Sequence, residues 1–147
     1  MIGEGSIELE DAAEHVYQAL LDPELLQRTI PGCRNFEDQG ERRYAALMEA
    51  GVGPIKGAFK AKFAVTDVRP PEGYTLQVEG QGTPGSVFGR VTVSLVSSAP
   101  QRTQLRYAYD INVSGKIAMV GQRMLDAAAK MVAAQFFKRL REELAAR

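Results

Sequence analysis

The chain has 147 residues, of which 45% are hydrophobic and 24% charged, and its formal net charge is zero. These values describe one globular domain over residues 1–147 that can bury a core, and they give no reason to expect a nucleic-acid partner. With one cysteine, Cys33, and one histidine, His15, the chain lacks an internal disulfide and the ligand set of a zinc site. We therefore expect no metal site and no tightly bound cofactor.

The first residues lack the basic and apolar regions of a signal peptide, and no stretch approaches the roughly 18 apolar residues of a membrane span. We therefore expect a cytoplasmic protein without a transmembrane segment. The charge is unevenly spread, because residues 116–147 hold seven Lys or Arg and three Asp or Glu. Cations near the end of a helix interact favourably with its dipole. This excess of positive charge does not exclude a peripheral position at the inner face of the membrane.

The N-terminal part of the chain predicts a strand followed by two short helices. Apolar and polar residues alternate over residues 6–10, which is typical of a half-buried strand. Asp11 and Glu14 have the spacing of a capping box, so we expect a helix over residues 12–21. A second, short helix should begin at Asp22-Pro23, with Asp as the cap and Pro at the first helical position.

Residues 33–114 have the pattern of antiparallel strands joined by tight turns. Apolar side chains alternate with polar ones, and clusters of glycine and proline separate the runs. This alternation predicts one apolar and one polar face of the sheet. Glycines within the runs indicate a strongly curved sheet.

Residues 115–147 are predicted to form one long helix without an internal proline. Its expected inner stripe follows helical spacing and consists of Met124, Leu125, Ala128, Val132, Phe136 and Leu140. The middle of this helix is rich in alanine, so it can approach a sheet closely or leave room beside itself. Packing into a core is the more frequent role of such a stripe.

The order of these elements indicates an α+β fold. We expect a curved antiparallel sheet of about six to seven strands wrapped on the long C-terminal helix, with two short helices after the first strand. Nothing else in the chain is long enough to cover the apolar face of the sheet. A curved sheet on one helix tends to leave a cavity between them.

Several short motifs, in this order and spacing, carry a family resemblance. They are Ile30-Pro31-Gly32-Cys33, GPIKG at 53–57, GQGTPG at 80–85, and VSGKIA at 113–118 followed by GQR at 121–123. Over residues 3–142 the chain resembles the family of the carbon monoxide dehydrogenase G subunit. That family belongs to the START/Bet v 1-like (polyketide cyclase) superfamily, so the resemblance implies a helix-grip fold.

The resemblance also implies a function. Family members look like accessory proteins of molybdenum hydroxylases such as carbon monoxide dehydrogenase. They bind an apolar molecule, for which a menaquinone-type quinone or a lipid is the expected ligand, and help to deliver electrons or the enzyme to the membrane. Some members carry a long C-terminal tail that reaches the membrane. The present chain stops at Arg147 without such a tail, which puts direct membrane recruitment in doubt.

We expect the ligand to contact apolar residues that point into the cavity from the second helix, the inner sheet face and the long helix. These are Leu25, Leu26, Ile30, Phe59, Phe63, Leu76, Val78, Val87, Val91, Tyr107, Tyr109, Met124, Leu125, Ala128 and Val132. Ligand sites of this kind are mostly apolar, with a few polar groups that fix orientation. Tyr107 and Tyr109 are the inward groups that could hydrogen-bond a quinone carbonyl, although a tyrosine satisfied by the backbone is an equal alternative.

Two other functions remain open from the sequence, and we assign no catalytic residue. The first is a cyclase or hydratase that uses Tyr107, Tyr109 or Asp110 as acid or base in the same cavity, although the alternation places Asp110 towards water. The second is an adaptor with a filled core that acts through its surface. A homodimer is also left open.

Overall fold

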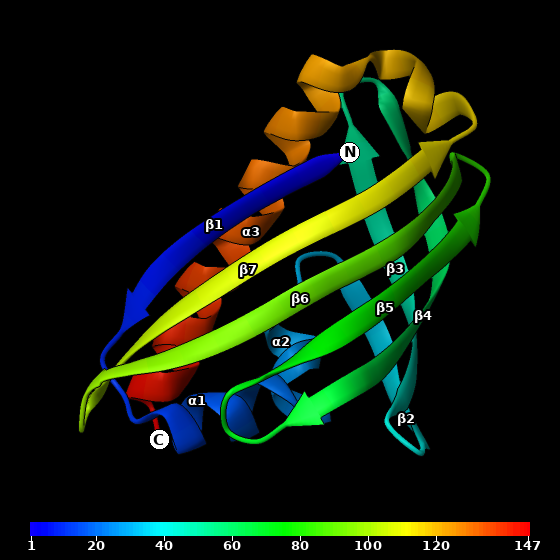
Figure 1. Ribbon diagram of the computed structural model, residues 1–147. Coiled ribbons are helices and arrows are strands. Elements are labelled where there is room, and N and C mark those ends of the chain that lie inside the picture. Colours follow the sequence, from blue (N-terminus) through cyan, green and yellow to red (C-terminus); the bar gives the residue numbers. More distant parts are fainter.

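The computed structural model describes residues 1–147 and has the expected α+β helix-grip architecture (Figure 1). Seven antiparallel strands form one sheet in the order β1-β7-β6-β5-β4-β3-β2. The strands are β1 (Ile2–Leu9), β2 (Cys33–Gly40), β3 (Arg43–Val52), β4 (Ile55–Arg69), β5 (Gly73–Gly82), β6 (Gly85–Ala99) and β7 (Arg102–Ser114). The helices are α1 (Ala13–Leu20), α2 (Pro23–Thr29), the 3-10 helix η1 (Lys116–Val120) and α3 (Gln122–Ala145).

The sheet curves so that its inner face looks towards α3, while α1 and α2 lie near one end of it (Figure 1). Strand β7 illustrates the alternation: Leu105 and Ile111 are buried, whereas Arg106 and Asp110 are exposed. The same period of two holds in the neighbouring strands, because successive side chains of a strand point to opposite faces. Asp110 therefore faces solvent, as the alternation predicts.

The two short helices begin differently from one another. At α2, the Asp22 side chain accepts a hydrogen bond from the Glu24 amide at 3.0 Å and Pro23 follows it, as expected. At α1, the N-cap is Ala12, without a side-chain cap. Asp11 instead accepts a hydrogen bond from the Ala12 amide and pairs with His15 at 2.9 Å, so the predicted capping box does not form.

The predicted single helix over 115–147 is wrong at its start. Gly115 and Gly121 have φ values of +86° and +94°, in the left-handed region that favours glycine. They bound η1 on both sides, and α3 begins only after Gly121. This break lets η1 pack Ile117 against Phe59 and Leu125 at one end of the sheet.

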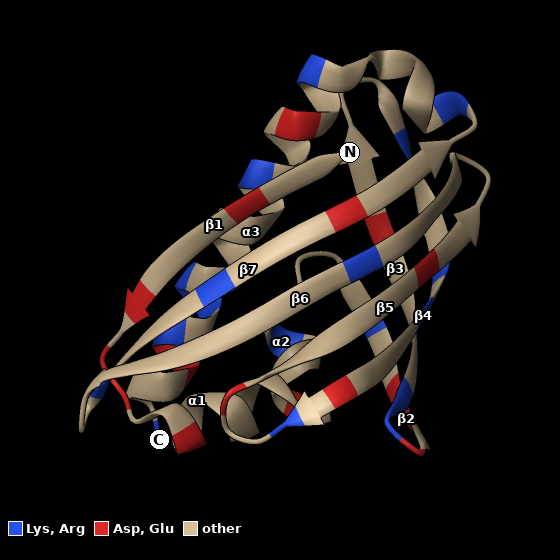
Figure 2. Ribbon diagram, in the orientation of Figure 1, with Lys and Arg blue, Asp and Glu red and all other residues tan.

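The core is divided into two clusters that support α3 at opposite ends. A large cluster near α1 and α2 includes Leu140, and a small one near η1 includes Leu125. The C-terminal part of α3 is also tied to α2, because Glu143 accepts hydrogen bonds from Arg28 at 2.8 and 3.1 Å. Basic residues recur along α3 (Figure 2), and all of them are exposed. No helix combines the length and the apolar composition that crossing a membrane requires.

Candidate functional site

An apolar pocket of 340 Å³ lies between the inner face of the sheet and α3. It is lined by 23 residues, of which 22 are hydrophobic and the other is Pro31. No charged side chain contributes to this wall. Its volume falls at the lower end of the roughly 300–1,000 Å³ that is usual for small-molecule sites.

The pocket exists because the middle of α3 is small where it faces the sheet. Ala129 and Ala133 line the pocket, whereas Leu125 and Leu140 fill the core near the two ends of the helix. An alanine side chain ends at Cβ, so Ala129 and Ala133 leave a space between the helix and the curved sheet that larger side chains at these two positions would fill. The alanine-rich middle of α3 therefore leaves room beside itself.

Aromatic side chains dominate the wall, since eight of the chain's eleven aromatic residues line it. Towards β2 and β3, Phe36 stacks on both Tyr44 and Phe63, at ring-centroid distances of 5.3 and 6.0 Å. On the α3 side, Phe137 contacts Tyr107 at 5.2 Å and Phe136 at 5.3 Å. Such a wall favours a flat, conjugated ligand, because offset and edge-to-face contacts between rings are attractive.

The polar side-chain atoms of the wall are the hydroxyls of Tyr44, Tyr74, Tyr107 and Tyr109. Burial raises the pKa of Tyr74 strongly, and burial together with Asp126 raises the pKa of Tyr109. Both phenols are therefore protonated at neutral pH and can donate hydrogen bonds. They are poorly suited to act as general bases.

Two glycines of β1 determine where the hydroxyls of β7 lie. In the register of these strands Gly5 is opposite Tyr107 and Gly3 is opposite Tyr109. A Cβ atom on Gly5 would overlap the Tyr107 hydroxyl and lie 2.6 Å from its Cζ, and one on Gly3 would meet Tyr109 in the same way. The rings therefore lie across β1 at positions where no side chain occupies the space.

The structure places eight of the predicted ligand residues in the wall of this pocket. They are Leu26, Ile30, Phe63, Leu76, Val91, Tyr107, Tyr109 and Val132. Their contact with a ligand remains a prediction.

The other predicted residues lie elsewhere. Leu25 is fully buried in the large core cluster, and Phe59 and Leu125 belong to the small one. Met124 is 41% exposed and lies beside Gly53 at the β3–β4 turn. Ala128 is one position away from Ala129, the alanine that lines the pocket. Val78 and Val87 point to the inner face of the sheet, in register with Phe63 and Gly80, but they lie outside the wall of this pocket and border a different hollow.

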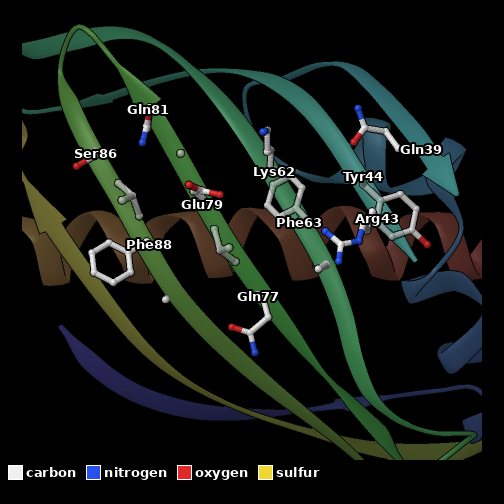
Figure 3. Close-up of a pocket in the computed structure, with 15 residues that line it drawn as sticks. Gln39, Arg43, Tyr44, Lys62, Phe63, Gln77, Glu79, Gln81, Ser86 and Phe88 are labelled. Carbon is white, nitrogen blue, oxygen red and sulfur yellow. The ribbon is translucent and has the colours of Figure 1, made fainter. Parts of the chain in front are cut away.

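That second hollow lies on the outer face of the sheet, with α3 behind it (Figure 3). It is open, and its wall mixes cations, a carboxylate and amides, among them Arg43, Lys62, Glu79, Gln77 and Gln81. These groups do not converge on one point (Figure 3). It is therefore a weaker candidate for a small-molecule site than the pocket under α3.

Sequence reasoning missed several wall residues, including Phe36, Tyr44, Tyr74, Ala129, Ala133 and Phe137. Tyr44 and Tyr74 fall on the inward positions of the alternating strands, so that signal could have found them. Phe36 could not be found in this way, because β2 is irregular and shifts register after Arg34. The only histidine, His15, is exposed on α1 and pairs with Asp11, outside the pocket. No three His, Cys, Asp or Glu side chains form a metal-binding group.

Comparison with known proteins relates the chain to one family and one fold. The sequence model of the family described as the carbon monoxide dehydrogenase G subunit (CoxG) matches residues 5–145. A conserved protein from Geobacillus kaustophilus is 41% identical, with a TM-score of 0.95 over 99% of this chain and 95% of that chain. No curated protein matches the chain.

Two more distant structures share the fold. A START superfamily protein from Mycobacterium smegmatis is 16% identical, with a TM-score of 0.76 over 98% of this chain and 97% of that one. The Zhui aromatase/cyclase from Streptomyces is 14% identical, with a TM-score of 0.72 over 99% of this chain and 93% of that one. At these identities the likeness concerns the fold alone.

Proposed function

The chain belongs to the family of the carbon monoxide dehydrogenase G subunit (CoxG), and we propose that it is an accessory protein that binds an apolar small molecule in the pocket under α3. The observation that carries this proposal is the wall of 22 hydrophobic residues without a charged side chain. A site of this composition binds by removing apolar surface from water. It lacks the charged side chains that would bind a polar metabolite.

The aromatic wall favours a ligand with a flat conjugated ring, and a menaquinone-type quinone satisfies this requirement. Tyr107 and Tyr109 are hydroxyl donors for its carbonyl oxygens. A volume of 340 Å³ suits the ring system better than a long prenyl chain. Val132 lines the pocket and is 51% exposed, and the neighbouring Met131 is 64% exposed. A tail can therefore leave the pocket along this part of α3.

In this proposal the protein holds the quinone for a redox partner. The family description names carbon monoxide dehydrogenase, and we propose a molybdenum hydroxylase of that kind as the partner. Exchange of a quinone with a membrane pool would place the protein in the cytoplasm, at the inner face of the membrane. A lipid in the same pocket is the other ligand that this wall would accept.

The two rival functions fit the pocket less well. A cyclase or hydratase needs groups that exchange protons near neutral pH, whereas the pKa of Tyr109 is raised above its ordinary value and Asp110 faces solvent. An adaptor with a filled core would have no pocket of this size beneath its helix. We therefore favour the binding function.

The proposal can be tested by titrating a short-chain menaquinone into the purified protein, with native mass spectrometry and thermal unfolding as readouts. We expect one ligand per chain and a stabilisation of about 2.7 kcal/mol when the free ligand exceeds its Kd a hundredfold. Ala133→Leu should weaken binding by filling the pocket, while Ala134→Leu, the same change at the neighbouring exposed position, should not. Absence of binding to the unmodified protein, or equal binding by both variants, would contradict the proposal.

A further inference from the structure

The outward side of α3 carries an exposed apolar stripe. From Met124, an apolar residue recurs after three, four and seven positions, so the stripe stays on one side of the helix and ends at Met131. Both methionines are exposed, as is Val132 beside them, and Met119 on the adjoining η1 is 86% exposed. The solvent side of a helix in a globular protein is usually polar. This side therefore has the composition of a contact surface.

Unpaired positive charge borders the stripe. Arg123 and Lys130 each directly precede one of the methionines, and they are seven positions apart, so they lie together on one flank. Lys138 continues the line of the stripe two turns further on. These three cations are exposed, and none of them forms an ion pair within the protein. The one acid between residues 116 and 141, Asp126, is half-buried and accepts a hydrogen bond from a glutamine of its own helix at 2.8 Å.

This combination matches the surface of a bilayer that contains anionic lipids. The apolar side chains of such a helix enter the region just below the headgroups, while Lys and Arg keep their charges at the headgroup level. Each cation close to an anionic surface adds attraction. A second copy of the chain matches this face less well, because a two-fold contact would bring the unpaired cations of both helices together.

The opening of the pocket lies on the same part of α3. Val132 lines the pocket, is exposed, and directly follows Met131. A ligand that is held by an apolar wall and carries a long prenyl chain dissolves in a bilayer, and exposing it to water costs free energy in proportion to its apolar area. Contact between this face and the bilayer would let the ligand move between membrane and pocket without crossing bulk water. The ligand chemistry therefore favours a lipid surface over a protein surface here.

We propose that the outward face of the first half of α3 docks on a bilayer that contains anionic lipids, and that the ligand enters and leaves the pocket past Val132. The passage of the ligand rests on the proposed binding function, whereas the docking itself does not require an occupied pocket. In the docked state α3 lies along the membrane surface, with Met124 and Met131 in the apolar boundary and the flanking cations among the headgroups.

Vesicle flotation with the full chain tests the docking, using phosphatidylcholine with phosphatidylglycerol (about 7:3) and phosphatidylcholine alone. The protein should bind the anionic vesicles more tightly, and added salt should weaken this binding because it screens the charges. Met131→Asp should weaken it about tenfold or more. Phe88→Asp, the same loss and charge at an exposed position on the outer face of the sheet, should change it by less than about twofold.

A second matched pair isolates the charge. Lys130→Gln should weaken binding to the anionic vesicles about fivefold, the usual effect of one cation near such a surface. Lys60→Gln removes the same charge from an exposed position of β4 and should have no such effect. All four positions are exposed, so each variant should unfold at nearly the temperature of the unmodified protein.

Fluorescence locates the contact directly, because the chain has no tryptophan. The emission of Met131→Trp should shift to shorter wavelength when anionic vesicles are added, since the indole leaves water. The emission of Phe88→Trp should stay unchanged under the same conditions. A shift at position 88 and none at position 131 would place the membrane contact on the sheet and overturn the proposal.

The outcomes separate docking from ligand binding. If the unmodified protein binds no anionic vesicles, or if Met131→Asp and Phe88→Asp bind alike, the docking face is wrong. Titration of a short-chain menaquinone in solution needs no vesicle, so it tests the binding function independently. If that titration fails while Met131→Asp alone loses vesicle binding, the docking stands and the ligand passage past Val132 falls with the binding function.

Two other occupants of this face would also overturn the proposal. A dimer in analytical ultracentrifugation that Met131→Asp dissociates would assign the face to a second copy of the chain. Weaker binding of Met131→Asp to a purified carbon monoxide dehydrogenase, with unchanged binding to vesicles, would assign it to a protein partner.

Discussion

Replacement of Gly5 by alanine should displace Tyr107 from the pocket wall. The new Cβ would overlap the Tyr107 hydroxyl and lie 2.6 Å from its Cζ, so the ring has to move. Movement disrupts the contact between Tyr107 and Phe137, whose centroids are 5.2 Å apart. The backbone of Gly5 is not in the left-handed region, so backbone strain adds nothing.

The expected cost follows from these contacts. Insertion of a methyl group into a packed site costs about 1–3 kcal/mol, and loss of an aromatic pair about 0.5–1.5 kcal/mol as part of that cost. Alanine has fewer conformations than glycine in the unfolded chain, and this loss of entropy stabilises the folded state by about 0.4–1 kcal/mol. We therefore expect Gly5→Ala to lower the free energy of unfolding by about 1–2 kcal/mol.

Urea unfolding followed by circular dichroism measures this change. Gly80→Ala is the matched control, because Gly80 is also in a strand but its nearest neighbour, Phe59, would lie at an ordinary 3.9 Å from the new Cβ. It should be neutral or slightly stabilising. The cost of Gly5→Ala should largely disappear in a Tyr107→Ala background, since the overlap is then absent. If Gly5→Ala is as stable as the control, the ring does not lie across β1 and the reasoning is wrong.

Three further predictions concern the core and the surface. Leu140→Ala should lower the free energy of unfolding by about 2–5 kcal/mol in the same urea assay, because Leu140 is fully buried in the large cluster. Thr103→Val should cost about 1–3 kcal/mol, since the buried Thr103 hydroxyl donates to the Asp11 carbonyl at 2.8 Å and valine leaves that oxygen unpaired. The hydrogen bond from Arg28 lowers the pKa of Glu143, so Glu143 stabilises the fold at neutral pH and loses this contribution as the pH falls through that lowered pKa. Urea midpoints of the unmodified protein and Glu143→Gln should therefore differ at pH 7 and converge at acidic pH, and a gap that does not narrow would contradict this.

The sheet could be predicted from the sequence because alternation with a period of two assigns each side chain to a face. Leu105, Tyr107, Tyr109 and Ile111 were expected to face inwards and they do. The order of elements, with the family motifs, was sufficient for the α+β helix-grip fold.

The site could be predicted only in part, because it depends on the rotation of α3 about its axis. A stripe that includes both Met124 and Leu125 fits the helical period, but only Leu125 is buried. The alanine-rich middle does not fix this rotation, since Ala128 and Ala129 have identical side chains. Gly121 also separates η1 from α3. The prediction of one continuous helix relied on the absence of proline, which says nothing about a break at a glycine.

The position of β1 has a consequence for the order in which the chain can fold. Each strand from β2 to β6 pairs with the strand that follows it in sequence, so these pairs can form as the chain grows. The first strand pairs with the last one, and Ile2 lies opposite Asp110, roughly a hundred positions away. On a ribosome, β1 therefore waits without a partner until β7 has emerged, and Ile7 and Leu9 stay uncovered meanwhile. Assembly of the pocket wall, which includes Tyr107 and Tyr109 laid across β1, is thus one of the last steps of folding rather than one of the first.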